Sequence, residues 1–220
     1  MATAKRRVRK LEVDRAYHHG DLRRALIESA LAIVAEQDGS RTLTLREVAR
    51  HAGVSHAAPY RHFRDKRALL TAVADEGFRM LRRTILEARR RAGDDPKARF
   101  VATGLAYLDF IRMNEAHALV MFGPDVAKGD DLPLQLEANE TFQVMKATIT
   151  DCRGEHEPVE AQRRLGTIVW ALAHGIALLS TNGQIPASVG AKPDDLLREG
   201  LGVLFETWRT APRRARRRRE

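Results

Sequence analysis

The sequence contains one cysteine, Cys152, among 220 residues. One cysteine cannot form an intrachain disulfide, so we expect no disulfide framework and a half-buried thiol, as suits a reducing cytoplasm. Aromatic residues are only 5% of the chain, and neither runs of β-branched residues nor segments of alternating polarity occur. Because 44% of the residues are hydrophobic and Ala, Leu and Arg are plentiful, the composition predicts an all-α fold with a sizeable core.

Signals for several other classes of protein are also missing. The N-terminus is basic but has no apolar stretch of the kind found in signal peptides. The most apolar run, Leu165 to Leu179, is shorter than the roughly 20 residues of a membrane span and contains His174, so we expect a buried helix. We find no glycine-rich phosphate loop, no nucleophile beside a base and no metal-ligand spacing, so we expect no enzyme, cofactor or metal site.

The net charge of +9 is unevenly distributed along the chain. Residues 1–93 carry 21 Lys and Arg against 11 Asp and Glu, residues 94–210 carry 11 against 17, and residues 211–220 carry 6 against 1. A basic N-terminal part followed by an acidic remainder is typical of a protein whose first part alone contacts phosphates. The pattern therefore favours a nucleic-acid-binding segment near the N-terminus.

The stretch Thr44 to Lys66, TLREVARHAGVSHAAPYRHFRDK, carries the most specific pattern in the chain. Its first part has four apolar residues at helical spacing: Leu45, Val48, Ala49 and Ala52. Gly53 can end that helix in the left-handed conformation, and Ser55 can cap a second helix directly afterwards. Two short helices joined so tightly predict a helix-turn-helix, whose second helix enters the DNA major groove. Phe63 would then turn into the core.

With YHHGDLRRALIESALAIVAEQ before it and RALLTAVADEGF after it, this stretch resembles the DNA-binding domain of the TetR family of bacterial transcriptional regulators. The matching features are a hydrophobic first helix, AGVS at the turn, Tyr60 with His62 and Phe63, and Lys66 at the start of a long helix. Exposed positions and resemblance together suggest nine DNA-contacting residues: Thr44, Arg46, Ser55, His56, Ala57, Tyr60, Arg61, His62 and Lys66.

One position departs from the usual pattern of that family. Pro59 occupies a site where a large aliphatic residue commonly precedes the tyrosine. Proline has no amide hydrogen, so it would remove the first intrahelical hydrogen bond, which the Ser55 carbonyl would accept. We therefore expect the second helix to begin more tightly than usual, which leaves the direction of His56 and Ala57 open.

The remaining patterns predict about nine helices and five segments. The segments are a basic disordered arm (1–16), a helix-turn-helix domain of three helices (17–66), a connecting helix (67–93), an effector-binding and dimerisation domain (94–210) and an Arg-rich disordered tail (211–220). The arm is either a solvated tail or an extension along phosphates or into a minor groove. Expected later helices are 96–113, 117–122, 134–153, 159–179 and 194–209, with a loop over 125–133 and solvated arginines on the connecting helix.

Trp170, His174 and Gly175 resemble the Trp-His-Gly signature of one type of C-terminal domain in the TetR family. These residues are either core residues or part of the wall of an effector pocket. Aromatic and Met side chains with one or two polar groups suit a hydrophobic ligand, although they also suit an ordinary core. The candidate pocket residues are Tyr107, Phe110, Met113, His117, Met121, Phe122, Phe142, Met145, Trp170 and His174.

The last two predicted helices combine small residues, which permit close helix approach, with large apolar ones. Two such pairs around a two-fold axis would form a four-helix bundle. The expected homodimer interface comprises Gly166, Ile168, Leu172, Ala173, Leu179, Leu197, Leu201, Leu204 and Trp208.

These patterns favour a ligand-responsive transcriptional regulator, specifically a repressor that binds a palindromic DNA operator as a homodimer. The resemblance implies that a small, hydrophobic effector tilts the connecting helix and releases the DNA. A constitutive, weakly sequence-specific architectural DNA-binding protein, attached by its basic arm and tail, is the alternative.

Overall fold

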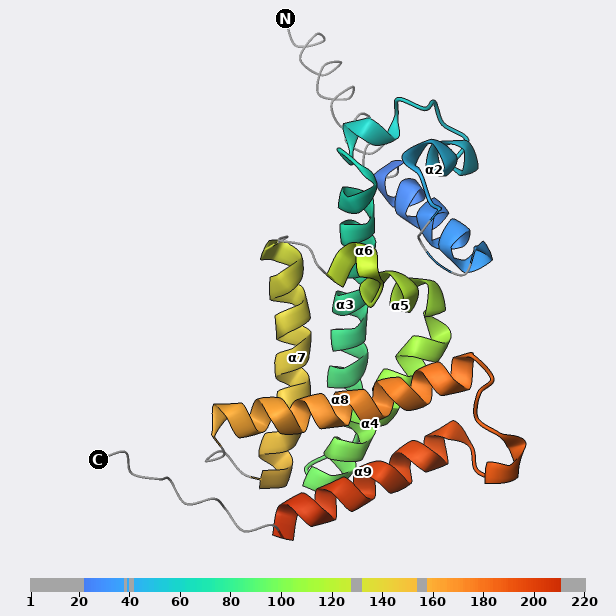
Figure 1. Ribbon diagram of the computed structural model, residues 1–220. Coiled ribbons are helices and arrows are strands. Elements are labelled where there is room, and N and C mark those ends of the chain that lie inside the picture. The colour runs from blue at the N-terminus through green and yellow to red at the C-terminus, as the bar shows by residue number, and fades with distance from the viewer. Residues whose placement is uncertain (1–21, 38, 40–41, 128–131, 154–157, 211–220) are drawn as a thin grey trace, which may run out of the picture. The chain divides into compact units, whose positions relative to one another are not determined.

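The computed structural model describes residues 22–37, 39, 42–127, 132–153 and 158–210 (Figure 1). The described residues contain nine α-helices, two short 3-10 helices and no strand, which confirms the all-α class. The chain divides into two compact units, Met1–Gly77 with Glu115–Leu134 and Phe78–Asn114 with Gln135–Glu220. The predicted basic arm and the Arg-rich tail lie outside the described residues.

The first unit holds the predicted helix-turn-helix. Its elements are a helix over residues 22–36, α2 (Leu45–His51), the 3-10 helix η1 (Pro59–Arg61), the first part of α3 (Lys66–Arg91), α5 (Glu115–Met121) and α6 (Pro124–Ala127). The helix over 22–36 and α2 gather around the start of α3 (Figure 1). The loop expected over 125–133 is wrong at both ends, because Pro124 opens the short helix α6 and α7 begins at Leu132.

Buried apolar side chains from each of its first helices form the core of this unit. They include Leu26, Ile33, Val34, Leu45, Val48, Phe63, Leu69, Leu70 and Val73. Phe63 is buried as predicted, and the Arg23 guanidinium lies 5.4 Å from the centre of its ring. This core fixes the orientation of the more exposed side chains on the same elements.

Glycine determines two features of the first unit. Gly53 follows α2 with a φ of 67°, its amide donates to the Arg50 carbonyl, and the Val54 amide donates to the Ala49 carbonyl. This is the pattern of a Schellman motif and confirms that Gly53 ends the helix. Gly77 allows α5 to approach α3 closely, because a Cβ atom at this position would lie 2.4 Å from Sδ of Met121.

The second unit contains the remainder of α3 and four long helices, α4 (Pro96–Met113), α7 (Leu132–Arg153), α8 (Val159–Thr181) and α9 (Pro193–Thr210). A 3-10 helix, η2 (Ala187–Val189), lies between the last two. Helix α4 contacts both α8 and α9, which also contact each other (Figure 1). The predicted bounds of these four helices differ from the observed ones by no more than two residues.

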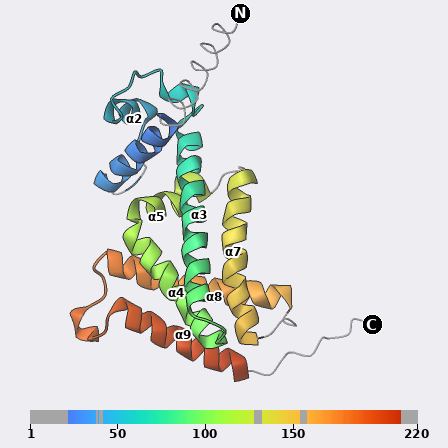
Figure 2. The same cartoon turned by 180° about the vertical axis from the view of Figure 1, so that it is seen from behind.

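Ion pairs join the second half of α3 to α7, and the two helices run side by side in both views (Figures 1 and 2). Arg82 lies 3.3 Å from the Glu137 carboxylate and also pairs with Glu140. Arg89 pairs with Asp151 at 2.7 Å, with only 14% and 15% of the two side chains exposed. The expectation that these arginines line a solvated face is therefore wrong for Arg82 and Arg89.

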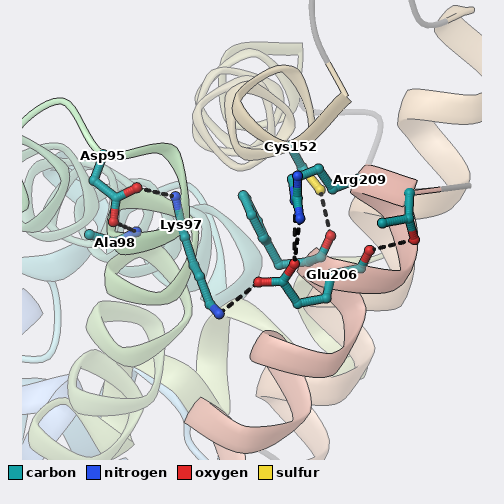
Figure 3. A network of polar contacts seen from close by, with 8 residues as sticks. Asp95, Lys97, Ala98, Cys152, Glu206 and Arg209 are labelled. Carbon is teal, nitrogen blue, oxygen red and sulfur yellow. Dashed lines mark hydrogen bonds and ion pairs between the residues drawn. The ribbon is translucent and has the colours of Figure 1, made fainter.

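Polar contacts also fasten the end of α9 to α4 and α7 (Figure 3). Asp95 caps α4 by accepting from the amides of Lys97 and Ala98, and Nζ of Lys97 donates to Glu206 at 2.8 Å. Hydrogen bonds from Lys97 and Arg209 lower the pKa of Glu206. The thiol of Cys152 is buried and donates to the Phe205 carbonyl at 3.5 Å, so it is more enclosed than predicted.

We expect Arg89→Ala to lower the free energy of unfolding by about 2–3 kcal/mol, because it leaves the Asp151 carboxylate without its cation in a largely buried place. Arg91→Ala, which removes an exposed pair with Glu87 on the same helix, should cost about 0.5 kcal/mol or less. Urea denaturation of both variants measures the difference. Equal losses would show that the Arg89 pair contributes no more than a surface pair.

Candidate functional site

The candidate nucleic-acid surface begins at the N-terminus of α2. Thr44 is the N-cap of this helix, and its hydroxyl accepts from the Glu47 amide at 3.2 Å. Arg46 is exposed in the first turn, while Leu45 and Val48 are buried on the opposite side. The alternation follows from the helical period, which directs the apolar residues inward and leaves the polar ones outside.

Residues 55–63, which we call the reading segment, do not form the α-helix that the sequence predicts. The Ala58 amide donates to the Ser55 carbonyl at 2.9 Å, and only Pro59–Arg61 is helical, in the 3-10 form. The sequence predicts that the Ser55 hydroxyl caps this helix. The prediction is wrong, because the N-cap position of η1 is occupied by Ala58, which makes no side-chain cap bond. The tight start expected from Pro59 therefore extends as far as His62, while the Phe63 amide donates four residues back to the Pro59 carbonyl.

Seven of the nine predicted DNA contacts are exposed: Thr44, Arg46, Ser55, His56, Ala57, Tyr60 and Arg61. Tyr60 has 54% of its surface exposed, which is uncommon for a large aromatic side chain in a folded domain. The other two are half-buried. The ring of His62 lies against Phe63 at 6.5 Å, and Nζ of Lys66 lies 3.4 Å from the Asp125 carboxylate of α6.

The predicted set omits two further cations on the same elements. Arg50 in the last turn of α2 and Arg67 in the first turn of α3 are both exposed. Their positive charge was the available signal, since Arg50 lies within the stretch Thr44 to Lys66 and Arg67 directly follows it. Exposed hydrogen-bonding groups, one ring and several cations on a buried scaffold can together contact base edges and phosphates.

A second polar cluster lies inside the second unit, where α4 and α8 meet. Nε1 of Trp170 donates to the Tyr107 hydroxyl oxygen at 3.1 Å, and this hydroxyl lies 2.7 Å from Nδ1 of His174. Indole nitrogen can only donate, so the Tyr107 hydroxyl oxygen accepts from Trp170. In the bond between Tyr107 and His174, the donor is set by the tautomer of His174, and a neutral ring whose Nδ1 is unprotonated accepts the Tyr107 hydrogen.

Burial perturbs both titratable groups of this cluster. Tyr107 is almost completely buried, and this burial raises its pKa well above the ordinary range. Burial also lowers the pKa of His174. Both shifts favour the neutral forms, so the cluster is an uncharged hydrogen-bonded chain within a largely apolar unit.

Comparison with known proteins identifies the family of the chain. Residues 26–73 match the family model described as bacterial regulatory proteins, tetR family, and residues 100–204 match that of the tetracyclin repressor-like C-terminal domain. The chain is 34% identical to a solved protein of unknown function from Rhodococcus sp. RHA1, with a TM-score of 0.73 over 86% of this chain and 96% of that one. The chain belongs to the TetR family.

Two more distant structures share the fold of this TetR-family chain. A bacterial regulatory protein of the tetR family from Rhodococcus RHA1 has 19% identity and a TM-score of 0.64, over 86% of this chain and 98% of that one. A TetR-family transcriptional regulator from Bordetella parapertussis 12822 has 22% identity and a TM-score of 0.60, over 84% and 93%. Membership confirms a DNA-binding transcriptional regulator with a helix-turn-helix.

The candidate effector residues of the TetR-family chain are divided between the two units. Tyr107, Trp170 and His174 lie together, while Phe110 and Met145 are buried and Phe142 is half-buried in the same unit. His117, Met121 and Phe122 belong to the first unit. Met113 is 84% exposed, so its placement in a pocket is wrong.

His117, one of the candidate effector residues, is buried in the first unit. Nε2 of His117 is buried without a hydrogen-bond partner, and burial lowers the pKa of His117 although the Glu76 carboxylate acts in the opposite direction.

A groove of about 920 Å³ lies between α4 and α9, with Val101, Leu105 and Val203 among its lining residues. None of the predicted effector residues lines this groove.

Four of the predicted dimer residues are buried within the single chain: Gly166, Ala173, Leu197 and Leu201. These assignments are wrong, because the inner faces of α8 and α9 already pack on their own unit. A Cβ atom at Gly166, for example, would contact the ring of Phe142 at 3.7 Å. Ile168 and Leu179 are exposed, and Leu172, Leu204 and Trp208 are half-buried.

Helix α8 is less buried than the sequence predicts. Among the described helices it alone is long and apolar enough to cross a membrane, which for a single helix is weak evidence. Only 22% of the most apolar 18-residue window of α8 is buried within the chain. The prediction of a buried helix is therefore wrong for the outer side of α8. That side carries Ile168, Leu178 and Leu179.

We expect the free energy of unfolding to fall as the pH decreases below about 6.5, the ordinary pKa of an unfolded histidine. Below this pH the unfolded chain binds a proton at position 174, whereas the folded chain resists it until the pH reaches the lowered pKa of His174. His174→Asn, whose amide oxygen can accept from Tyr107, should make the pH dependence shallower.

Urea denaturation between pH 8 and pH 5.5 measures this effect. His51→Asn, a substitution on the exposed surface of α2, is the matched control. Superimposable pH profiles for the wild type and His174→Asn would contradict the proposed protonation state of the cluster.

Proposed function

We propose that the chain is a ligand-responsive transcriptional repressor that binds a palindromic DNA operator as a homodimer and is released by a small effector. The observation that carries the proposal is the exposed row of hydrogen-bonding side chains on α2 and the reading segment, supported by a buried core. Side chains held in this way can read the major groove, because their scaffold is already in place before DNA binds.

We assign two roles to the exposed residues. Thr44, Arg46 and Lys66 bind phosphates and set the register of the protein on the duplex, and the residues of the reading segment contact base edges. Lys66 is paired with Asp125 at 3.4 Å, so its ammonium group must exchange this carboxylate for a phosphate when DNA binds. The exchange would link DNA affinity to the position of α6.

The proposed effector is small and largely apolar. Support comes from the cluster of Tyr107, Trp170 and His174, which combines aromatic surface with a few hydrogen-bonding groups in an otherwise apolar unit. An effector that binds one state of the regulator more tightly than the other shifts the balance between DNA-bound and free protein. We assign these roles to three segments: DNA binding to residues 17–66, the connection to the helix over 67–93, and effector binding to residues 94–210.

A revised interface supports the homodimer. Helices α8 and α9 carry the exposed Ile168, Leu179 and Val203 and the half-buried Leu172 and Leu204. Apolar side chains gathered on neighbouring helices are a common mark of a protein interface. A two-fold dimer formed through this surface would carry two reading segments, one for each half of a palindrome.

The first test is fluorescence anisotropy with the DNA upstream of the chain's own gene and scrambled DNA of equal length, at near-physiological salt. We expect wild type to prefer its own DNA by about 10³-fold or more. The double variant His56→Ala with Tyr60→Ala should lose this preference, because it removes base-contacting groups. Arg83→Ala, an exposed change on α3 beyond the first unit, should retain it.

Binding of both DNAs with equal affinity by wild type would instead favour the architectural protein. Under that alternative, removal of residues 211–220 should weaken binding to both DNAs by the same factor, because counterion release depends on charge and not on sequence.

The dimer is tested with Val203→Asp and Ile168→Asp. Both positions are exposed in the single chain, with 62% of Val203 accessible, so the substitutions should leave the monomer folded. A carboxylate buried at the proposed interface should raise the dimer dissociation constant more than tenfold. Sedimentation velocity measures this change, with Val189→Asp on η2 as control. Dimers of unchanged stability would place the interface elsewhere.

A further inference from the structure

Three backbone hydrogen bonds of the reading segment run three residues back along the chain, while the Phe63 amide donates four residues back, to the Pro59 carbonyl at 2.9 Å. The amide of Ala58 donates to the Ser55 carbonyl, that of Arg61 to the Ala58 carbonyl, and that of His62 to the Pro59 carbonyl, at 2.9–3.2 Å. In an α-helix the Ser55 carbonyl would accept from the residue at position 59. Pro59 has no amide hydrogen, so this bond cannot form.

This change of bonding rotates the side chains relative to one another. Residues four apart differ in direction by about 40° in an α-helix but by about 120° in a 3-10 helix, while residues three apart become aligned. His56 would share an α-helical face with Tyr60. Residues 56–58 form a turn and only Pro59–Arg61 is helical, so this shared face is not formed.

The burial of Pro59 indicates that this residue influences DNA binding only indirectly. Pro59 is buried, while Tyr60 directly after it is 54% exposed. Pro59 therefore does not contact DNA itself, and its effect must pass through the backbone that carries its neighbours. An aromatic ring presented in this way can make apolar contact with a thymine methyl group, and its hydroxyl can bond to a base edge.

We propose that Pro59 is a positioning residue that sets sequence preference, because it prevents an α-helix over the reading segment and so removes Tyr60 from the α-helical face that it would share with His56. The inference rests on the proposed function of this surface. It goes beyond that function by naming the residue that selects which side chains read the bases.

The test is selection of binding sites from a random duplex library by the full chain and by Pro59→Leu and Pro59→Ala, both of which restore the missing amide. We expect each variant to enrich a different base at one or more positions of each half-site. Affinity for the site selected by the wild type should fall about tenfold or more, a loss typical of one mismatched contact. Pro186→Ala, in the second unit, should select the wild-type site.

Two measurements separate a change of aim from a loss of structure. For at least one Pro59 variant, the midpoint of thermal unfolding should stay within a few degrees of the wild-type value. The affinity of the same variant for random DNA should stay within about twofold of the wild-type affinity. If both variants enrich the wild-type site with unchanged affinity, or if both unfold, the inference is overturned. If the wild type itself enriches no sequence, the proposed function fails first.

Discussion

Helix α3 is the element on which both compact units depend, since its 26 residues continue from one into the other. Its first half is fixed by burial of Leu69, Leu70 and Val73 in the core of the first unit. Its second half is fixed by Arg82 and Arg89, which pair with carboxylates of α7. Any displacement of α3 must therefore disturb either an apolar core or a set of partly buried ion pairs, and both have a substantial cost.

Local rules predicted much of this fold. Thr44 and Asp95 cap helices through their own side chains, and Gly53 ends α2 as its conformational freedom requires. These signals act within a few residues, so they can be read from the sequence. The sequence wrongly predicts an α-helix over the reading segment, because local rules account for the one bond that Pro59 removes, whereas three bonds of this segment run three residues back. Helix α6 was missed because a four-residue helix has no detectable period.

Features that depend on contacts between distant residues could not be predicted in the same way. Helices α8 and α9 are apolar on more than one side, so periodicity alone does not tell which side packs on the same chain. The exposure of seven of the nine predicted DNA contacts was easier to predict, because these residues belong to one short motif. Tyr107 and His174 are 67 positions apart, and only packing of α4 on α8 brings them together.

The central claim is that this TetR-family chain reads a defined DNA sequence with two copies of one small surface. Footprinting of the full chain on the DNA upstream of its own gene tests this claim most directly. The account predicts a two-fold symmetric protected site, with half-sites centred about 10 base pairs, or a multiple of that distance, apart. Protection that spreads evenly along the fragment, without a preferred site at any protein concentration, would contradict it.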